Sequence, residues 1–348
     1  MNIWQSLSGL TSSVSKTKNR IVIFVTLTGL LTIFFLLSCL FGSTDASLLD
    51  GISALVKGNI NSPEYRIIFY IRMPRAIASV LAGAALAVAG VLIQAVLNNP
   101  MAAPNIIGVN SGAGLAAALT IAVFPSALDL LPITAFLGAL VACFLIYAIS
   151  VKSGAGRLTI TLVGIAVGSV LNAGINTVKV MFPDSVYDAD VFMIGGFSGI
   201  TYDKLTPACY IIAVCIVLAI FMAKDTDVLC LGETTAASLG VNILLLRFLL
   251  LVIASALAGA AVSFAGLLGF VGLLVPHIMR RFVGNRHTLL IPTSAMLGAA
   301  LVLACDLFSR TVAAPYEIPV GIVLSFVGGI FFICLVLFRK RGVGCDKA

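Results

Sequence analysis

The stretch from Arg72 to Gly114 reads RMPRAIASVLAGAALAVAGVLIQAVLNNPMAAPNIIGVNSGAG and decides the class of fold. Between Ala76 and Leu97 it has no charged residue, and a helix of this length crosses about 30 Å of hydrocarbon. Its alanines and glycines would let neighbouring helices approach closely. Asn98-Asn99-Pro100 predicts the end of the helix, because proline lacks an amide donor and disfavours helical backbone in the residue before it. The stretch therefore predicts a membrane helix with a defined start and end.

The rest of the chain has the same apolar character. Of its 348 residues, 60% are hydrophobic and 10% are charged, and the mean hydropathy is +1.15. A soluble domain carries about 25% charged residues, so the composition predicts an all-α membrane protein with many spans. The eight cysteines form no CxxC pair and mostly lie in apolar runs, where we interpret them as small buried hydrophobic residues.

Ten apolar runs predict about ten transmembrane helices within residues 21–338, between a cytoplasmic tail at 1–20 and another at 339–348. The first run is long and lacks a convincing cleavage site, so it is interpreted as a span and not as a signal peptide. Some runs are short, and one or two are expected to tilt or to enter the membrane partway. The runs are 21–41, 76–97, 105–124, 130–150, 158–182, 205–222, 243–263, 268–283, 289–309 and 318–338.

The charged residues orient these spans. With the N-terminus inside, fourteen Lys and Arg residues fall inside and seven outside, whereas four acids fall inside and ten outside. This bias predicts that both termini lie in the cytoplasm, as expected of a multi-pass protein of the cytoplasmic (inner) cell membrane. It also explains the net charge of +7 without a nucleic acid partner. Arg72, Arg75 and Arg310 lie on the outside, against the bias, and need another reason.

An internal repeat relates the second run to the seventh. LAGAALAVAGVL at 81–92 and LAGAAVSFAGLL at 257–268 share eight identities in twelve positions without a gap. The two runs stand five places apart in the order of spans, so they would cross in opposite directions, as in an inverted repeat. Chance likeness of two Ala- and Gly-rich helices is the alternative. The same offset of 176 residues aligns further pairs, Pro100 with Pro276 and Gly108 with Gly284.

Motifs for catalysis are absent from the sequence. It has two histidines, no HExxH, no Walker A loop and no GxGxxG in a suitable unit. Asp306 is the one acid clearly inside a predicted span and lies near its outer end, whereas proton-coupled carriers bury acids at mid-membrane. We therefore expect no enzyme activity, no catalytic residue, no metal site and no cofactor in this chain, and an energy source outside it.

The segment KDTDVLCLGETTAASLGV at 224–241 predicts a cytoplasmic loop with a short helix. Gly232 and Glu233 would open the helix and Gly240 would end it, and a glutamate in the first turn interacts favourably with the helix dipole. One interpretation is a solvated loop with a surface helix. The other is a helix that lies across the membrane face and docks into a partner.

Six motifs are specific in combination. They are RMPR at 72–75, NNPMAAPNIIGVNSGAG at 98–114, MIGGFSG at 193–199, LGETTAASLGV at 231–241, GFVGLLVPHIMRRFVG at 269–284 and EIPVGIV at 317–323. With these motifs the chain, from about residue 20 to 341, resembles the permease subunits of ATP-binding-cassette importers for iron-siderophores, haem and cobalamin (the FecCD-like, type II importers). Asn98 departs from the usual family form, which has a glutamate at that position.

The resemblance implies how the protein would assemble. Permeases of this family have ten spans per subunit and work as a pair, either two copies or two different chains. Two ATP-binding subunits sit below the pair, and an external substrate-binding protein delivers the substrate. ATP binding and hydrolysis would drive alternating access, in which the spans tilt to open one gate.

The resemblance also assigns docking and coupling residues. Arg72, Arg75 and Arg310 match external arginines that receive glutamates of the binding protein, with ordinary snorkelling at the interface as the alternative. The stretch 232–239 matches the coupling helix that fits a cleft on the ATPase. The coupling residues implied in it are Gly232, Glu233, Ala236 and Leu239.

Asn99 and Met101 match a cytoplasmic gate, with the loop from Lys152 to Leu158 as its companion. Asn99 has an alternative role, which is to stop the helix before proline. Pro276-His277 lies in the family motif VPHIMR, where packing and helix termination are favoured over ligand binding.

Three polar residues of the fifth run, Asn172, Asn176 and Lys179, lie at i, i+4 and i+7 on one helical face. Polar groups inside a membrane face a cavity or the bundle interior. The family places this helix along the central path between paired subunits, so these side chains are expected to line that path. Hydrogen bonding between helices is the alternative.

The sequence as a whole predicts a permease that moves an iron-siderophore, or a related chelate such as haem or cobalamin, inward. A secondary carrier driven by an ion gradient is the alternative, because its inverted repeat would look similar. The match to the coupling helix and the lack of mid-membrane acids favour the importer. The choice among these chelates stays open, and so does the choice between two copies and two different permeases.

Overall fold

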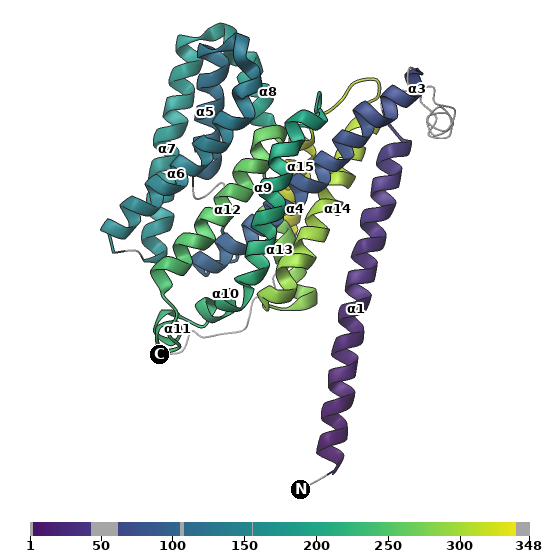
Figure 1. The fold of residues 1–348 in the computed structure, drawn as a ribbon, viewed down its shortest axis with the longest axis vertical. Helices are drawn as coiled ribbons and strands as arrows, with labels where there is room; N and C mark the ends of the chain where they lie inside the picture. The colour runs from purple at the N-terminus through teal and green to yellow at the C-terminus, as the bar shows by residue number, and fades with distance from the viewer. Residues whose placement is uncertain (1–2, 43–61, 105–107, 155, 339–348) are drawn as a thin grey trace.

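The computed structural model describes residues 3–42, 62–104, 108–154 and 156–338, and these ranges fold into a bundle of helices (Figure 1). The predicted tail at 339–348 lies outside the described residues. The longer helices are α1 (Ile3–Leu40), α4 (Met73–Leu97), α5 (Val109–Val123), α6 (Leu131–Lys152), α7 (Arg157–Met181), α9 (Tyr202–Phe221), α12 (Ile243–Ala265), α13 (Val271–Val283), α14 (His287–Thr311) and α15 (Val320–Phe338).

Each of the ten predicted runs overlaps one of these ten helices, which confirms the predicted all-α polytopic fold. Seven described helices are long and apolar enough to cross a membrane by length and composition, and α1 does so through Arg20–Leu40. The other three do not meet this length within the residues that the structure describes in full. Val109–Val123 and the stretch Val320–Leu335 of α15 are apolar but shorter, and Val271–Val283 has only 13 residues and carries two arginines in its last turn.

Several short helices lie outside the predicted runs. They are α3 (Pro63–Arg66), η1 (Ile67–Arg72), η2 (Pro125–Leu130), η3 (Pro183–Ser185), α8 (Val186–Ile194), α10 (Ala223–Cys230) and α11 (Glu233–Ser238). The first two extend α4, so one helical segment runs from Pro63 to Leu97 where the sequence predicts a start at Ala76. The Ser62 side chain caps this segment by accepting a hydrogen bond from the Tyr65 amide at 3.2 Å.

The end of α4 agrees with the sequence prediction. The helix stops at Leu97, and Asn98 follows with a φ of 47°, in the left-handed region that asparagine tolerates. The short helix predicted between Gly232 and Gly240 is also present, as α11. Both glycines have positive φ, 117° and 80°, which side chains other than glycine rarely adopt.

Helix α4 forms the centre of the bundle and packs against α9, α12, α13 and α14 (Figure 1). Its glycines set the distances between helices. A Cβ atom on Gly90 would lie 1.9 Å from the carbonyl oxygen of Gly272 in α13, and one on Gly83 would lie 2.2 Å from that of Gly298 in α14. Such backbone approach is typical of membrane helices, which associate through small residues.

The two copies of the internal repeat lie on α4 and α12, which pack together and run in opposite directions (Figure 1). At one aligned pair of glycines the two copies differ in backbone conformation. Gly90 continues α4, whereas Gly266 ends α12 with a φ of 68°. A Cβ atom on Gly266 would lie 2.4 Å from the carbonyl oxygen of Phe192, so this glycine also permits a close approach. The aligned Gly108 and Gly284 both have positive φ, 69° and 77°.

We expect Gly90→Ala to lower the stability of the chain by about 1–3 kcal/mol, because the added methyl group forces α4 and α13 apart. The matched control is Gly29→Ala in α1, where a Cβ atom meets nothing within 4 Å. It should leave the melting temperature unchanged or raise it slightly, because alanine favours helix over glycine. Thermal unfolding in detergent compares the two variants, and equal melting temperatures would contradict the packing described here.

Candidate functional site

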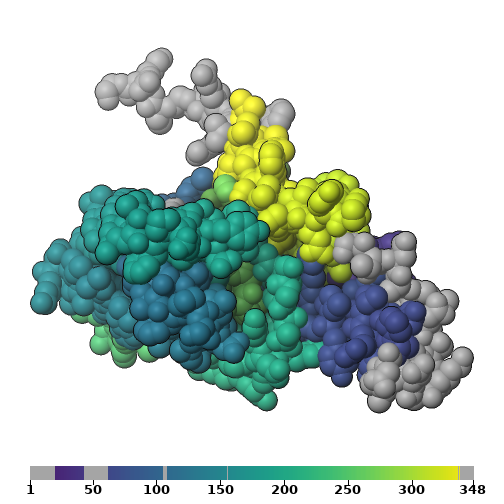
Figure 2. All heavy atoms as spheres, turned by 90° about the horizontal axis from the view of Figure 1, so that it is seen from above, coloured from purple at the N-terminus to yellow at the C-terminus, as the bar shows by residue number. Residues whose placement is uncertain are grey.

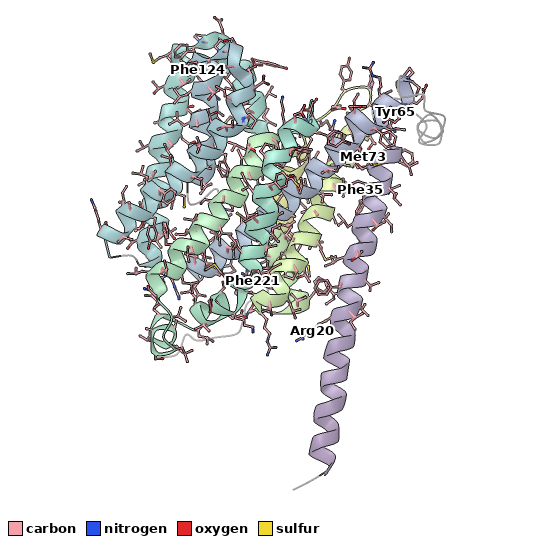
Figure 3. All side chains as sticks on the ribbon, viewed as in Figure 1. Arg20, Phe35, Tyr65, Met73, Phe124 and Phe221 are labelled. Carbon is pink, nitrogen blue, oxygen red and sulfur yellow. The ribbon has the colours of Figure 1, made fainter. Side chains whose placement is uncertain are left out.

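Charged and polar side chains that interact with one another gather at the two ends of the bundle. Figure 3 labels Tyr65, Met73 and Phe124 at one end, which we call the outer end, and Arg20 and Phe221 toward the other, which we call the inner end. The names follow the orientation predicted from the positive charges.

Two of the outer arginines hold the last turn of α1. Arg72 donates hydrogen bonds from Nη1 to the carbonyl oxygens of Cys39 at 3.1 Å and Leu40 at 2.6 Å. Arg310 donates from Nη2 to the Ser38 carbonyl oxygen at 2.7 Å and also bonds the Ser38 hydroxyl. The last carbonyls of a helix have no intrahelical partner, and cations are favourable there. Arg72 and Arg310 therefore join α1 to α4 and α14.

The third arginine, Arg75, pairs with two carboxylates. Its Nε lies 3.0 Å from Asp306 Oδ1, and its Nη1 lies 2.7 Å from Glu317 Oε2. Asp306 also lies 3.6 Å from Arg310 Nε, so one fully buried carboxylate stands between two buried arginines. Glu317 is the accessible member of the cluster, with 31% of its side chain exposed.

The sequence analysis predicts a special role for the three arginines but does not predict their partners within the chain. All three are buried and engaged within the chain, so their docking to a binding protein stays a prediction. The sequence shows Asp306 only as an acid near the outer end of a span. Asp306 near the end of the apolar run 289–309 and Arg310 directly after it stand at i and i+4, and this spacing is the signal that could have revealed the pair.

A groove of about 600 Å³ opens on the side of the bundle. Its polar lining comes from Asn110 and Ser111 of α5, Asn172 of α7 and Ser325 of α15, and its apolar lining includes Phe270 and Phe326. Figure 2, viewed from above, shows α15 in yellow projecting from the body of the bundle. Because α15 projects, one wall of the groove is the exposed face of a single helix.

The three residues of the predicted polar face of α7 lie in different environments. Asn172 lines the groove, and Asn176 one turn later is exposed. Lys179 forms an ion pair with Asp190 of α8. The structure thus places one of the three residues in the groove and uses another to hold α8 against the end of α7.

The predicted gate residues lie at the inner end of α4. Both Asn99 and Met101 are exposed, and Asn99 Oδ1 accepts a hydrogen bond from the Met101 amide at 2.9 Å. This local turn is the kind that asparagine forms after a helix, so it accounts for Asn99 as a helix-stop residue. A gating role for the pair stays a prediction.

The predicted coupling helix α11 lies at the inner end (Figure 1). Ala236 is fully buried against the chain, whereas Leu239 is 61% exposed. Leu231, which directly precedes Gly232 and which the sequence prediction did not include, is 66% exposed. Two exposed leucines beside a short helix are suited to contact a partner, because such apolar surface is otherwise left in water.

Glu233 connects α11 to two other helices. Its Oε1 lies 2.6 Å from Arg247 Nη2 on α12 and 3.7 Å from Arg157 Nε at the start of α7. The hydrogen bond from Arg247 lowers the pKa of this carboxyl, and the charge of Arg157 adds to the effect. The carboxylate therefore stays ionised at neutral pH, hydrogen-bonded to Arg247 and within ion-pair distance of Arg157.

We expect Asp306→Asn to destabilise the chain by about 3–5 kcal/mol, because it leaves Arg75 and Arg310 buried beside each other without their shared counter-charge. Asp129→Asn is the matched control, since Asp129 is an exposed acid of the outer end. Thermal unfolding in lipid nanodiscs should show a large drop for the first variant alone. Equal melting temperatures for both would show that the buried cluster does not hold α1, α4 and α14 together.

Comparison with known proteins identifies the same family over most of the chain. Residues 30–338 match the model of the FecCD transport family. The Fe(3+)-citrate import system permease protein YfmE of Bacillus subtilis is 36% identical over 293 residues, which cover 84% of this chain and 88% of that protein. The hemin transport system permease protein HmuU of Yersinia pestis is 32% identical over 321 residues, covering 90% and 96%.

A solved structure agrees with the sequence matches. It is described as an inward-facing conformation of a transporter of the metal-chelate ABC type, and it superposes with a TM-score of 0.81 at 27% identity, covering 91% of this chain and 98% of the other. The chain therefore belongs to the FecCD transport family, the permeases of ABC importers for metal chelates.

Proposed function

We propose that this chain is the transmembrane permease of an importer that moves a ferric siderophore, or a related chelate such as haem or cobalamin, into the cytoplasm. The observation that carries the proposal is the groove lined by Asn110, Asn172 and Ser325, because it combines polar and apolar surface along one side of the bundle. A chelate has both kinds of surface. The relatives named for Fe(3+)-citrate and hemin transport support this class of cargo.

The groove also supports a pair of permeases. Phe326 of α15 is 69% exposed, and Asn172 on the opposite wall is exposed as well, so the groove is half of an enclosed passage. A second permease, either another copy or a different chain, would close it and cover the apolar face of α15. We place the path of the chelate at this junction.

Alternating access would use both ends of the bundle. An extracytoplasmic binding protein docks at the outer end near Arg72, Arg75 and Arg310, where Glu317 is the accessible charge of the cluster. Asn99 and Met101 close the path at the inner end, and two partner ATPases bind there and supply the energy. Both termini then lie in the cytoplasm, as the positive charges predict.

A secondary carrier is the competing function, and Asp306 bears on it. A carrier coupled to protons needs an acid that gains and loses its charge along the path. Asp306 is instead fixed between Arg75 and Arg310. This pairing favours an energy source outside the chain.

We expect uptake of a ferric siderophore by vesicles containing the chain and its co-purifying subunits to depend on ATP. Orthovanadate should abolish this uptake, and an uncoupler should leave it nearly unchanged. The control is the same vesicle preparation with an ATPase subunit inactivated in its Walker A lysine, which should not transport. Uptake that resists vanadate but collapses with the uncoupler would identify a secondary carrier.

We expect Leu231→Glu and Leu239→Glu each to weaken assembly with the ATPase by about tenfold or more, because an unpaired charge replaces exposed apolar surface at the contact. Leu130→Glu, at an exposed leucine of the outer end, is the matched control and should assemble normally. Co-purification of the ATPase with each variant measures the effect. Undiminished co-purification with both inner-end variants would remove α11 from the ATPase interface.

A further inference from the structure

The carboxylate of Glu233 is the point where three helices of the inner end meet. Glu233 is the first residue of α11, Arg157 is the first residue of α7, and Arg247 lies in the second turn of α12. One oxygen atom, Oε1, is within 4 Å of both guanidinium groups. A displacement of α11 therefore acts on two transmembrane helices through one side chain.

The two ion pairs differ in how completely they are formed. Arg247 has only 3% of its side chain exposed and makes a hydrogen bond of 2.6 Å to Glu233. Arg157 stands at 3.7 Å, beyond hydrogen-bond distance. Its Nε and Nη2 are buried and find no hydrogen-bond acceptor among the described residues. Buried donors of this kind are costly, so a small shift that brings Arg157 onto Glu233 would be favourable.

At the inner end, Ile160 packs the first turn of α7 into the core, whereas the residues on either side of Arg157 are largely exposed. The residues before it, Val151 to Gly154, are exposed, and Leu158 directly after Arg157 is 81% exposed. The same helix lines the groove at Asn172, fifteen positions further on and about 22 Å along the axis. The position of Arg157 thus bears on the wall of the groove.

We propose that Arg157 and Glu233 are positioning residues that transmit movement of α11 to α7. Arg247 keeps Glu233 anchored on α12, while Arg157 engages or releases the same carboxylate as α11 is displaced, so that α7 and the groove wall follow. This inference rests on the proposed function, because a bound ATPase is what would move α11. It gives Glu233 a role inside the permease, in place of a charge that contacts the ATPase directly.

A solvated surface ion pair is the rival interpretation. Such pairs contribute little to stability and their removal has small effects. Stability alone does not separate the two, because under either interpretation Arg157→Gln should keep the melting temperature within about 3 °C. The discriminating measurement must report on α7 itself.

The test uses the chain together with the subunits that co-purify with it, with Asn172→Cys as the reporter and the native cysteines replaced. A water-soluble maleimide labels this cysteine with and without ATP and orthovanadate. With Arg157 present, trapping with ATP and orthovanadate should change the labelling rate. Arg157→Gln should abolish that change and lower uptake about tenfold, within the range of coupling between distant sites, while the ATPase still co-purifies. Arg157→Lys, which keeps the cation, should retain part of the response.

Two further variants control the experiment. Arg286→Gln removes a different cation of the inner end, one that is exposed, and should behave as the unaltered chain. The double variant Arg157→Gln with Glu233→Gln should be no more impaired than Glu233→Gln alone, because Glu233→Gln already removes the interaction with Arg157. An undiminished response in Arg157→Gln, or no response with Arg157 present, overturns the transmission role. Failure of any ATPase to co-purify with the unaltered chain would overturn the proposed function itself.

Discussion

The structure depends on the requirement that polar groups inside a membrane find partners within the protein. Hydrocarbon offers no hydrogen bonds, so the backbone must form helices and buried charges must be paired. The outer end of the bundle shows both consequences. Arg72 and Arg310 satisfy the last carbonyls of α1, and Asp306 balances Arg75 and Arg310 between α4 and α14. The cluster that neutralises buried charge is also the cluster that assembles three helices.

At the inner end the ion pairs of Glu233 are less buried than those of Asp306 in the cluster of the outer end. Glu233 is partly exposed, with 48% of its side chain accessible, and it joins three helix starts through ion pairs of unequal length. The partly exposed ion pair between Glu233 and Arg157 can form and break at little cost, whereas the ion pairs of the fully buried Asp306 cannot. This contrast suits a permease whose outer cluster holds helices together while its inner end responds to a partner. Between the ends, α7 carries Asn172 on the wall of the groove.

Much of the fold was predictable because membrane helices have strong local signals. The apolar run before Asn98 gave the end of α4 correctly, and the glycines at 232 and 240 gave the bounds of α11. The start of α4 was missed because Arg66 and Arg72 interrupt the apolar pattern, although the helix continues through them from Pro63. Local composition does not reveal that Arg72 is buried against carbonyls of another helix.

The sequence by itself determined the class of protein, the ten helices, the repeat on α4 and α12 and the family motifs, because these follow from hydropathy and from residues adjacent in the chain. Only the tertiary structure decided what each charged residue does. It paired Arg75 with Asp306 across 231 positions and brought Glu233 to Arg157 and Arg247. The physical reason is that the sequence can show that a charged residue in an apolar segment requires a partner, because an unpaired charge there is costly. Which residue becomes that partner depends on how helices distant in the sequence pack together.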